Sequence, residues 1–475
     1  MNINKTNLIE SISLIKKEES FIDQKTNLYS NSLYTRKFNC NNKIAHDNSK
    51  NIWIQAYGCS ANFADSEIIS GLLQKHGYKI VSEEGKSDLN IIVTCSVKDS
   101  TEHKILHQIG NLTKSNKPLV VAGCLPKTER KKIEEINPNA SLLGPNSLDK
   151  TLELVELAKY NKKGVFLADS NIEKINLPRI RINKAISMVQ IATGCLSQCS
   201  FCQTKIAKGR LKSYRPGSII RQVKNDISEG YKEIWLTSTD NGCYGKDINS
   251  TLVELLESCA SISGNYKLRV GMMNPMHLTD LLDGLIRIYK ESDKIFKFIH
   301  IPVQSGSQRI LKKMFRGDDI NSFKSIISKF RKEIPEVTIA TDIIVGFPGE
   351  SDADFNSTKD LIRETKPDIV NISKYSSRYG TQSSKLKKIR SDIVKNRTTV
   401  LHTLCRSISK ERNSLWKKWQ GDIFLDEINN NILQGRNYAY KSVIIQGDSS
   451  KLAIGEIVTV KILNYSAYSL FGKLI

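Results

Sequence analysis

Short apolar runs, each followed by a cysteine and then by a stretch of helical composition, recur near the start of the chain. The runs IWIQAY, LNIIVT and PLVVAG lead to Cys59, Cys95 and Cys124. This alternation predicts a parallel α/β sheet. Ligands of such sheets collect beyond the carboxyl ends of the strands. We therefore expect the three cysteines to converge, although 36 and 29 residues separate them.

A longer series of apolar runs begins at Ser187. Its six runs start at about residues 187, 233, 267, 297, 337 and 369, and each interval accommodates one crossover helix. A complete barrel of eight βα units needs about 250 residues, whereas these six units occupy roughly 190. The series therefore predicts a partial, TIM-like (βα)6 barrel, with its functional face at the carboxyl ends of the strands.

The two ends of the chain depart from this pattern. Residues 1 to about 50 are rich in Asn, Lys and Ser without a sustained period, which predicts a flexible extension. Beyond Trp419, short alternating runs between turn residues predict a small all-β barrel. The expected divisions are a flexible extension (1–49), a parallel α/β domain (50–160), the partial barrel (181–412) and the small β-barrel (413–475).

Composition narrows the partner and the compartment. Lys and Arg number 71 and Asp and Glu 49, and the resulting net charge of +22 suits a polyanion such as nucleic acid. No apolar run approaches the 18 or more residues of a membrane helix, and the N-terminus lacks the apolar core of a secretory signal. We expect a cytoplasmic protein with no membrane partner. Ten cysteines are too few for a disulfide framework and indicate metal or redox chemistry.

The strongest chemical signal is GCLSQCSFC, in the loop after the first strand of the long series. Cys195, Cys199 and Cys202 can bind three irons of a 4Fe–4S cube, which four cysteines normally hold. The fourth iron then offers an open position, where a substrate or cofactor can reach the metal. A zinc knuckle with a distant fourth ligand and three space-filling cysteines are the alternatives. The spacing of the three cysteines, at the mouth of a βα barrel, favours the cluster.

Several stretches resemble the radical S-adenosylmethionine (SAM) methylthiotransferases. They span residues 52 to about 380 and are YGCSANFADSE, VTCSVK, AGCLPK, ATGCLSQCSFCQTKIAKGRLKSY, EIWLTSTDNGCYGKD, LRVGMMNP, HIPVQSGS and TIATDIIVGFPGE. The resemblance is greatest to the archaeal and eukaryotic branch that acts on N6-threonylcarbamoyladenosine (t6A) at position 37 of tRNA. The end of the chain is similar to the TRAM domain of that family.

This resemblance implies an enzyme with two 4Fe–4S clusters. Cys195, Cys199 and Cys202 would hold the radical cluster that binds and cleaves SAM. Cys59, Cys95 and Cys124 would hold a second, sulfur-carrying cluster; three buried structural cysteines are the alternative. The resulting 5′-deoxyadenosyl radical would attack the unactivated C2–H bond of adenine, and a second SAM would methylate the sulfur. The expected product is 2-methylthio-t6A (ms2t6A) in the anticodon loop. An electron donor and a sulfur source are required but not identified.

Polar residues at other strand ends are expected to bind SAM or face the reaction chamber. The segment LTSTDNG lies where radical SAM enzymes usually have a Gly-Gly-Glu motif, which is absent here. A charge within an apolar strand is costly unless it is paired. The candidate cofactor contacts are Thr239, Asp240, Asn241, Arg269, Gln304, Ser305 and Asp342. Hydrogen-bonded turns are the alternative for most of them, and no catalytic acid or base is assigned.

Two groups of residues are candidates for tRNA binding. Lys205, Lys208, Arg210 and Lys212 follow the cluster cysteines with no acidic residue among them, so they are expected to hold phosphates. A solvated loop is the alternative. From Trp419 onwards five basic and five acidic residues cancel. Binding there would depend on stacking by Arg436 with Tyr438 or Tyr440, with packing inside the barrel as the alternative.

Two rival functions stay open at this point. The same chemistry could act on isopentenyladenosine 37 or on an aspartate of a ribosomal protein, although TSTDNGCYG and GRLKSY favour the threonylcarbamoyl branch. An RNA-binding or redox-sensing iron–sulfur protein would bind the same clusters but would not cleave SAM.

Four cysteines and one loop receive no role. Cys40, Cys243, Cys259 and Cys405 lack partners at ligand spacing and are interpreted as ordinary residues. The segment YSSRYGTQS (residues 375–383) lacks prolines that relatives often have, so its shape is not predicted.

Overall fold

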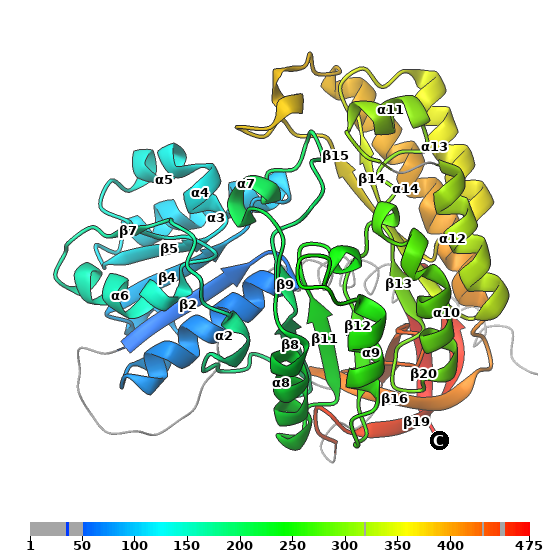
Figure 1. Cartoon of the computed structure of the whole chain (residues 1–475), viewed down its shortest axis with the longest axis horizontal. Coiled ribbons are helices and arrows are strands. Elements are labelled where there is room, and N and C mark those ends of the chain that lie inside the picture. The colour runs from blue at the N-terminus through cyan, green and yellow to red at the C-terminus, as the bar shows by residue number, and fades with distance from the viewer. Residues whose placement is uncertain (1–34, 38–50, 318–319, 430–431, 447–451) are drawn as a thin grey trace, which may run out of the picture.

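Three strand assemblies, each with its own apolar core, follow one another along the chain in this computed structural model (Figure 1). The structure describes residues 35–37, 51–317, 320–429, 432–446 and 452–475. Apart from Thr35–Lys37, which pair with the first sheet, the predicted extension at 1–49 lies outside the described residues. The predicted fold class, two α/β units followed by a small β-barrel, is confirmed.

The N-terminal domain is a sheet in the order β1-β2-β4-β5-β6-β7, with β3 beside β2. Only the β1–β2 pair is antiparallel among the described strands of this sheet. The middle strands are buried along almost their whole length and are mainly apolar, as expected of strands covered on both faces. The strands are β1 (Thr35–Lys37), β2 (Asn51–Tyr57), β3 (Lys79–Val81), β4 (Leu89–Thr94), β5 (Leu119–Gly123), β6 (Ser141–Leu143) and β7 (Val165–Phe166).

Helices cover both faces of this sheet (Figure 1). Apolar residues of two helices pack into the core on one face, and those of two others pack on the opposite face. The first pair is α2 (Ser60–Lys75) and α6 (Thr151–Lys159), and the second is α3 (Asp99–Thr113) and α5 (Arg130–Ile136), with the short α4 (Leu125–Thr128) between β5 and α5.

The central domain has the six predicted parallel strands. They form two sets, β8-β11-β12 and β13-β14-β15, which meet where Leu268 bridges to Ile295. A separate two-stranded sheet pairs β9 (Ala192–Thr193) with β10 (Lys212–Ser213). The six strands are β8 (Ile186–Gln190), β11 (Glu233–Thr237), β12 (Lys267–Val270), β13 (Phe298–His300), β14 (Thr338–Val345) and β15 (Ile369–Lys374).

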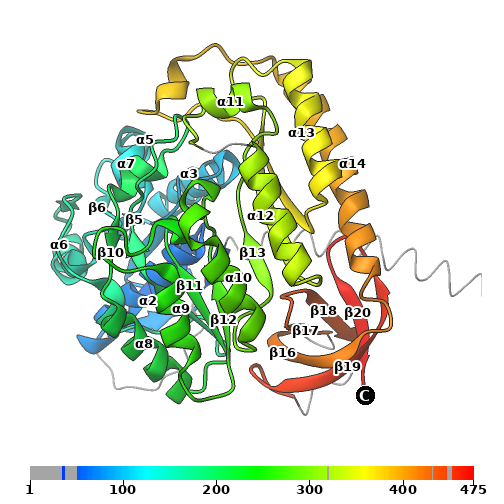
Figure 2. The same ribbon diagram turned by 45° about the vertical axis from the view of Figure 1, so that its right-hand side comes forward.

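Helices on the outside of the open barrel complete the central domain (Figure 2). Local signals fix where they begin: Pro216 occupies the first turn of one, and the capping boxes Thr251–Glu254 and Ser351–Asp354 begin two others. The helices are α7 (Thr204–Lys208), α8 (Pro216–Ser228), α9 (Leu252–Ala260), α10 (Leu282–Glu291), α11 (Gln308–Lys313), α12 (Ile320–Glu333), α13 (Asp352–Thr365) and α14 (Ser391–Ser414).

The chain ends in a closed barrel of five strands in the order β16-β17-β18-β20-β19. Figure 2 shows this barrel at the end of α14, below the central strands. Its strands are β16 (Gln420–Asn429), β17 (Ile432–Arg436), β18 (Ser442–Gln446), β19 (Ile457–Tyr465) and β20 (Leu470–Leu474). Among the described helices none has the length and apolar character needed to cross a bilayer.

Tyr440 fastens the C-terminal barrel to the amino-terminal ends of the central strands. Its ring, on a backbone with φ of 62°, contacts the rings of Trp235, Phe296 and Phe298 at centroid distances of 6.3, 4.9 and 4.8 Å. The Arg269 guanidinium lies 5.3 Å from the centre of the same ring. The C-terminal barrel therefore closes the end of the central domain opposite to the predicted functional face.

We predict that Tyr440→Ala lowers the free energy of unfolding by about 3 to 5 kcal/mol, because it removes a buried aromatic ring and leaves a cavity. Tyr440→Phe should keep most of that stability. Tyr468→Ala in the same barrel is the control, since Tyr468 is 50% exposed. Urea unfolding followed by tryptophan fluorescence measures the difference. Equal effects of Tyr440→Ala and Tyr468→Ala would contradict this account of the interface.

Candidate metal and cofactor site

Asn62 gathers the loops that carry the first three cysteines. Cys59 and Cys124 directly precede α2 and α4, and the thiol of each lies 3.9 Å from Asn62 Oδ1. The Asn62 amide nitrogen donates hydrogen bonds to the carbonyls of Tyr57 (3.0 Å) and Thr94 (2.8 Å). One buried side chain thus joins the ends of neighbouring strands and places their cysteines together.

Cys95 completes this group, which we call the N-terminal trio (Cys59, Cys95 and Cys124). Gly58 has φ of 108°, and a side chain there would place its Cβ 2.7 Å from Cys95 Sγ, so glycine is required. Burial raises the pKa of the Cys124 thiol to about 11, and burial together with Cys59 and Cys124 raises the pKa of Cys95. Such thiols ionise only beside a metal or a cation.

Lys208 supplies a cation to the N-terminal trio from the central domain. It is 5% exposed. Burial alone would lower the pKa of Lys208, but the nearby Cys59, Cys124 and Asp65 raise it above its ordinary value. Lys208 was predicted to hold an RNA phosphate; the structure instead encloses it between the two domains, because it ends α7, which contacts α4.

A second buried cation stands beside the first. Lys174 donates to Asp65 Oδ1 at 2.8 Å, and Gln190 donates to the same oxygen at 2.7 Å. Asp65 Oδ2 is buried with no hydrogen-bond partner among the described residues. The N-terminal trio therefore borders a polar network contributed by both domains, as a charged group held there would need.

The second group of cysteines, the SAM trio (Cys195, Cys199 and Cys202), lies in the loop between β9 and α7. The backbone amide of Ser197 donates to Cys195 Sγ at 3.3 Å. The Lys205 ammonium donates to the Cys195 carbonyl, so this predicted RNA contact shapes the cysteine loop. A hydrogen bond with Cys243 and another with Ser197 lower the pKa of Cys195 to about 6, against the opposing effect of burial.

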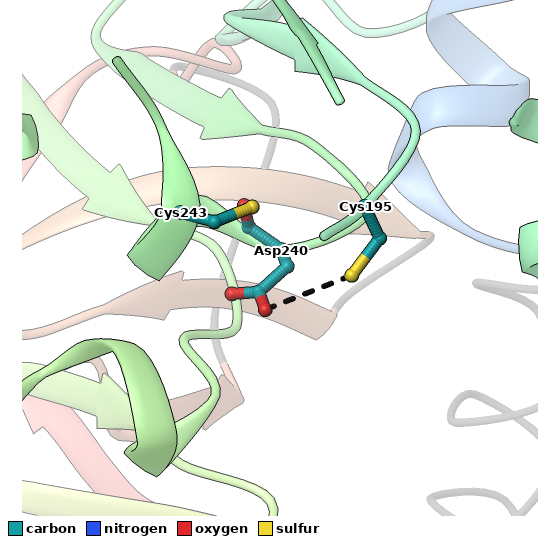
Figure 3. A group of neighbouring side chains, drawn as sticks. All are labelled: Cys195, Asp240 and Cys243. Carbon is teal, nitrogen blue, oxygen red and sulfur yellow. Dashed lines mark hydrogen bonds between the residues drawn. The ribbon is translucent and has the colours of Figure 1, made fainter. Parts of the chain in front are cut away.

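Asp240 and Cys243 lie against Cys195 at the end of β11 (Figure 3). Asp240 Oδ1 accepts hydrogen bonds from the amides of Gly242 (3.0 Å) and Asn274 (3.1 Å), and its Oδ2 lies 3.9 Å from Cys195 Sγ. Burial, and then Cys195, raises the pKa of Asp240 to about 7. Cys243, interpreted from the sequence as ordinary, is thus a direct neighbour of the SAM trio.

The spacing of the cysteines fits a cluster better than a single ion. Thiolates around one zinc ion lie about 4 Å apart, given a Zn–S distance of about 2.3 Å. Among the described residues, the only three candidate ligand atoms within 4.8 Å of one another are those of Cys195, Asp240 and Cys243. In neither trio do all three thiols lie within 4.8 Å of one another, so neither has the compact arrangement that a single ion needs.

The two trios face the same space. Ser60, next to Cys59, shares a hydrogen bond of 2.9 Å with Thr237 at the end of β11. Lys98, three residues after Cys95, is close enough to Asp342 to lower its pKa. The carboxyl ends of the N-terminal and central strands therefore meet at the domain interface, and we call the region between the two trios the chamber.

Asp342 belongs to a polar group in this chamber. Its carboxylate binds His300 Nε2 at 2.9 Å and accepts a hydrogen bond of 2.8 Å from Asn371. Burial would raise the pKa of Asp342, but His300, Asn371 and Lys98 outweigh it and the pKa is lowered. The charge of Asp342 within an apolar strand is therefore stabilised by these partners, as expected for a buried charge.

The other predicted cofactor residues fall into two groups. Thr239 Oγ1 is buried without a hydrogen-bond partner among the described residues, and Gln304 has φ of 73°. Unpaired polar atoms and strained backbone of this kind are typical of binding positions. In contrast, Asn241 bonds Ser238 and the Leu236 carbonyl, and Ser305 accepts from the amide of Ser307. The side chains of Asn241 and Ser305 hold the turns in which they lie.

Arg269 does not lie with the SAM trio. Its guanidinium stacks on Trp235 at 4.7 Å and on Phe298 and Tyr440 at 5.3 Å, at the closed end of the central domain. The sequence interpretation as a cofactor contact therefore gives way to a packing role, because aromatic faces surround this half-buried cation.

The predicted RNA contacts are also divided. Arg210 is exposed and Lys212 half-buried, and both line a cavity of about 120 Å³ beside Lys174 and Lys208. In the C-terminal barrel, Arg436 pairs with Asp426 at 3.1 Å. Tyr438 packs against Trp416 and Trp419. The side chains of Arg436 and Tyr438 are engaged inside the protein, where packing was the alternative.

Residues missed by sequence reasoning are mostly partners of the cysteines. Asn62, Lys174 and His300 occur singly, with no spacing that links them to a distant ligand. Cys243 could have been noticed because it follows Asp240 by three residues at a strand end. Cys259 and Cys405 are buried, and Cys40 lies outside the described residues.

Comparison with known proteins assigns all three parts. Residues 51–144 match the uncharacterized protein family UPF0004, residues 189–362 the radical SAM superfamily and residues 423–475 the TRAM domain. A probable threonylcarbamoyladenosine tRNA methylthiotransferase of Pyrococcus horikoshii is 39% identical over 86% of this chain and 99% of its own. The chain belongs to the threonylcarbamoyladenosine tRNA methylthiotransferase family. The human member is 32% identical over 89% of this chain and 73% of its own length.

Solved structures support the fold. The radical SAM methyltransferase TsrM from Kitasatospora setae, with tryptophan substrate and a SAM analogue bound, aligns with a TM-score of 0.53 at 12% identity, over 71% of this chain and 75% of that one. Because residues 189–362 match the radical SAM superfamily, the chain is expected to use SAM and 4Fe–4S clusters.

We predict that Cys195→Ala and Cys59→Ala each remove about four irons of the roughly eight expected for two clusters. The physical reason is that two remaining thiolates cannot hold a cube. Cys243→Ala is the matched control and should keep all the iron, because Cys243 touches Cys195 without completing the spread ligand set. Iron and sulfide analysis of anaerobically purified protein measures this. Full iron content in both trio variants would remove the cluster assignment.

Proposed function

We propose that this chain methylthiolates C2 of t6A at position 37 of tRNA, converting t6A to ms2t6A. The observation that carries this proposal is that two cysteine trios, one from each α/β domain, border a single chamber. The relatives named threonylcarbamoyladenosine tRNA methylthiotransferase support the choice of t6A, since they align over most of the chain.

The two trios have separate tasks. Cys195, Cys199 and Cys202 would hold a cluster that could supply the electron for cleavage of SAM, and Cys59, Cys95 and Cys124 would hold one that could supply sulfur. Asp240 is placed to bind a cationic amino group beside the SAM trio, because its carboxylate is buried and has an oxygen 3.9 Å from Cys195 Sγ. Thr239 can add a hydrogen bond through its unpaired hydroxyl.

The chamber between the trios receives the adenine. An unactivated C2–H bond does not ionise at neutral pH, so the reaction needs a radical and not an acid–base pair. His300, Asp342 and Asn371 form a fixed polar wall on the central domain. They can orient a base by hydrogen bonds, while Lys98 adds positive charge from the N-terminal domain.

The tRNA partner is supported by the TRAM match and by the net charge of +22. Of the basic residues suggested by the sequence, exposed Arg210 is the best placed to meet a phosphate. We propose that the enzyme acts in the cytosol, where tRNA and a reducing environment coexist. The electron donor and the sulfur source are separate proteins or small molecules.

We predict that the anaerobically reconstituted protein, given SAM, a reductant and sulfide, forms ms2t6A on tRNA bearing t6A. Nucleoside mass spectrometry measures the product. Cys195→Ala should lose both 5′-deoxyadenosine and ms2t6A, whereas Cys59→Ala should lose only ms2t6A because the SAM trio is intact. Cys259→Ala, a buried cysteine outside both trios, is the matched control and should retain both activities.

Two results would contradict this function. Product on isopentenyladenosine tRNA but none on t6A tRNA would reassign the substrate. Absence of 5′-deoxyadenosine from reduced protein with full iron content would leave a binding or redox-sensing protein.

A further inference from the structure

A loop that connects the two cysteine trios displays an exposed aromatic ring. We call residues 375–385 the bridging loop; it follows β15 and ends in a short 3-10 helix, Gln382–Lys385. In Figure 1 it is the gold segment at the top that reaches towards α7. The bonds that hold it come from the loops of both trios, so its position is linked to the chamber.

On the side of the SAM trio, two residues next to the cysteines bind the bridging loop. The Ser383 amide donates to the Ser200 carbonyl at 2.9 Å. The Gln203 side chain donates to the Tyr379 carbonyl at 3.3 Å, and Gln203 itself is 2% exposed. These bonds fix the backbone of the loop directly over the cysteine segment.

On the side of the N-terminal trio, Arg378 makes the connection. This buried arginine pairs with Glu102 and donates to the Val97 carbonyl at 3.3 Å, two residues after Cys95. Ser376 adds a hydrogen bond of 2.8 Å to Asp99. The bridging loop is therefore clamped at both sides, and its tip is not a freely moving segment.

Tyr379 projects from this clamped backbone into solvent. It is 73% exposed, more than any other large apolar side chain among the described residues. An exposed ring on a fixed backbone offers a ready platform for a ligand. Its position beside buried Arg378 separates it from the core, because adjacent residues of the loop point in opposite directions.

Other exposed apolar side chains lie on the segments next to the bridging loop. Ile206 reaches the tip of the bridging loop, since a Cβ at Gly380 would lie 2.9 Å from Ile206 Cδ1. Val97 and Leu196, which follow Cys95 and Cys195, are 55% and 37% exposed. We call these exposed apolar residues, Tyr379, Ile206, Val97 and Leu196, the apolar rim, since they lie on the bridging loop and on the segments that carry the trio cysteines.

The positive charge near the apolar rim indicates what kind of partner binds there. From Tyr375 to Ser391 the chain has no acidic residue, and Lys385, Lys387 and Lys388 are all exposed. An exposed aromatic ring beside a run of cations is the combination that holds unpaired bases by stacking and the phosphate backbone by charge.

We propose that Tyr379 stacks on an unpaired base that neighbours the modified adenosine, while the lysines after the bridging loop hold the adjacent backbone. This inference rests on the proposed function. The target adenine must leave the stack of the anticodon loop to enter the chamber, so a flanking base loses its stacking partner at the mouth. Tyr379 replaces that partner and positions the loop for the reaction.

The test measures RNA binding by the iron-loaded enzyme. The probe is an anticodon stem-loop RNA with t6A at position 37 and 2-aminopurine at position 38. Tyr379→Ala should weaken binding by about 5- to 150-fold, the effect of removing one base–aromatic stack, and should abolish quenching of the 2-aminopurine fluorescence. Tyr379→Phe should restore both. Tyr160→Ala is the matched control, because Tyr160 is 72% exposed on the N-terminal domain and away from the bridging loop.

Two further readouts separate binding from chemistry. Tyr379→Ala should raise KM for the stem-loop and leave RNA-independent SAM cleavage and iron content unchanged. Replacing Lys385, Lys387 and Lys388 by glutamine should reduce the dependence of log Kd on log salt by roughly 0.7 for each phosphate that the variant no longer binds.

The outcomes distinguish this inference from the proposed function. If the wild-type enzyme does not bind the stem-loop, the proposed function fails. If it binds and Tyr379→Ala binds equally well, only the stacking role fails. If Tyr379→Ala binds RNA normally but slows reduction of the clusters by flavodoxin, the rim is a docking site for a protein and the inference is overturned.

Discussion

The arrangement of this protein depends on a cation from one domain that is buried among the thiols of another. Lys208 ends the short helix that follows the SAM trio, yet its ammonium lies among Cys59, Cys95 and Cys124. An unpaired buried charge costs several kcal/mol, so the enclosed Lys208 ammonium needs partners of opposite charge from the N-terminal domain. The correct docking of the two α/β domains therefore depends on the groups of the N-terminal domain that surround Lys208. Lys174, Asp65 and Gln190 extend the same compensation.

The two ends of the central domain have different roles: one end packs against the C-terminal barrel, and the other end carries the candidate site. At the amino-terminal ends of its strands, Arg269 and Tyr440 join the C-terminal barrel to the central domain through contacts of aromatic rings. At the carboxyl ends, buried polar atoms remain without partners among the described residues and backbone angles depart from the common regions, as at Thr239 and Gln304. The amino-terminal ends are covered by the C-terminal barrel, whereas the carboxyl ends carry Thr239 and Gln304 next to the cysteine loops. This asymmetry is the usual division of labour in βα barrels.

Sequence reasoning predicted what depends on local pattern. Apolar periodicity predicted the six central strands, the three strand–cysteine units and the closed β-barrel. It is a strong signal because the buried positions of a strand must be mainly apolar. It was least successful with cations. In the sequence, Lys208 and Arg269 cannot be distinguished from basic residues that are solvated or that bind a ligand. Only the fold determines whether an anion, an aromatic face or water surrounds their side chains. Cys243 was set aside for the same reason: its neighbour Cys195 is 48 residues away in sequence but adjacent in space.

The bridging loop illustrates a further limit of reasoning from spacing. Its residues carry no cluster ligand, and its shape was not predicted from the sequence, yet it is bonded to Ser200 and Gln203 on one side and to Val97 and Glu102 on the other. A loop with these bonds couples the two trios mechanically: any shift of the N-terminal domain moves Arg378, and through it the residues that flank Cys199 and Cys202. The distance between two reacting centres on separate domains must be reproducible to within a fraction of an ångström. Ion pairs that are buried, such as Arg378 with Glu102, meet that requirement better than surface contacts, because water cannot replace either partner.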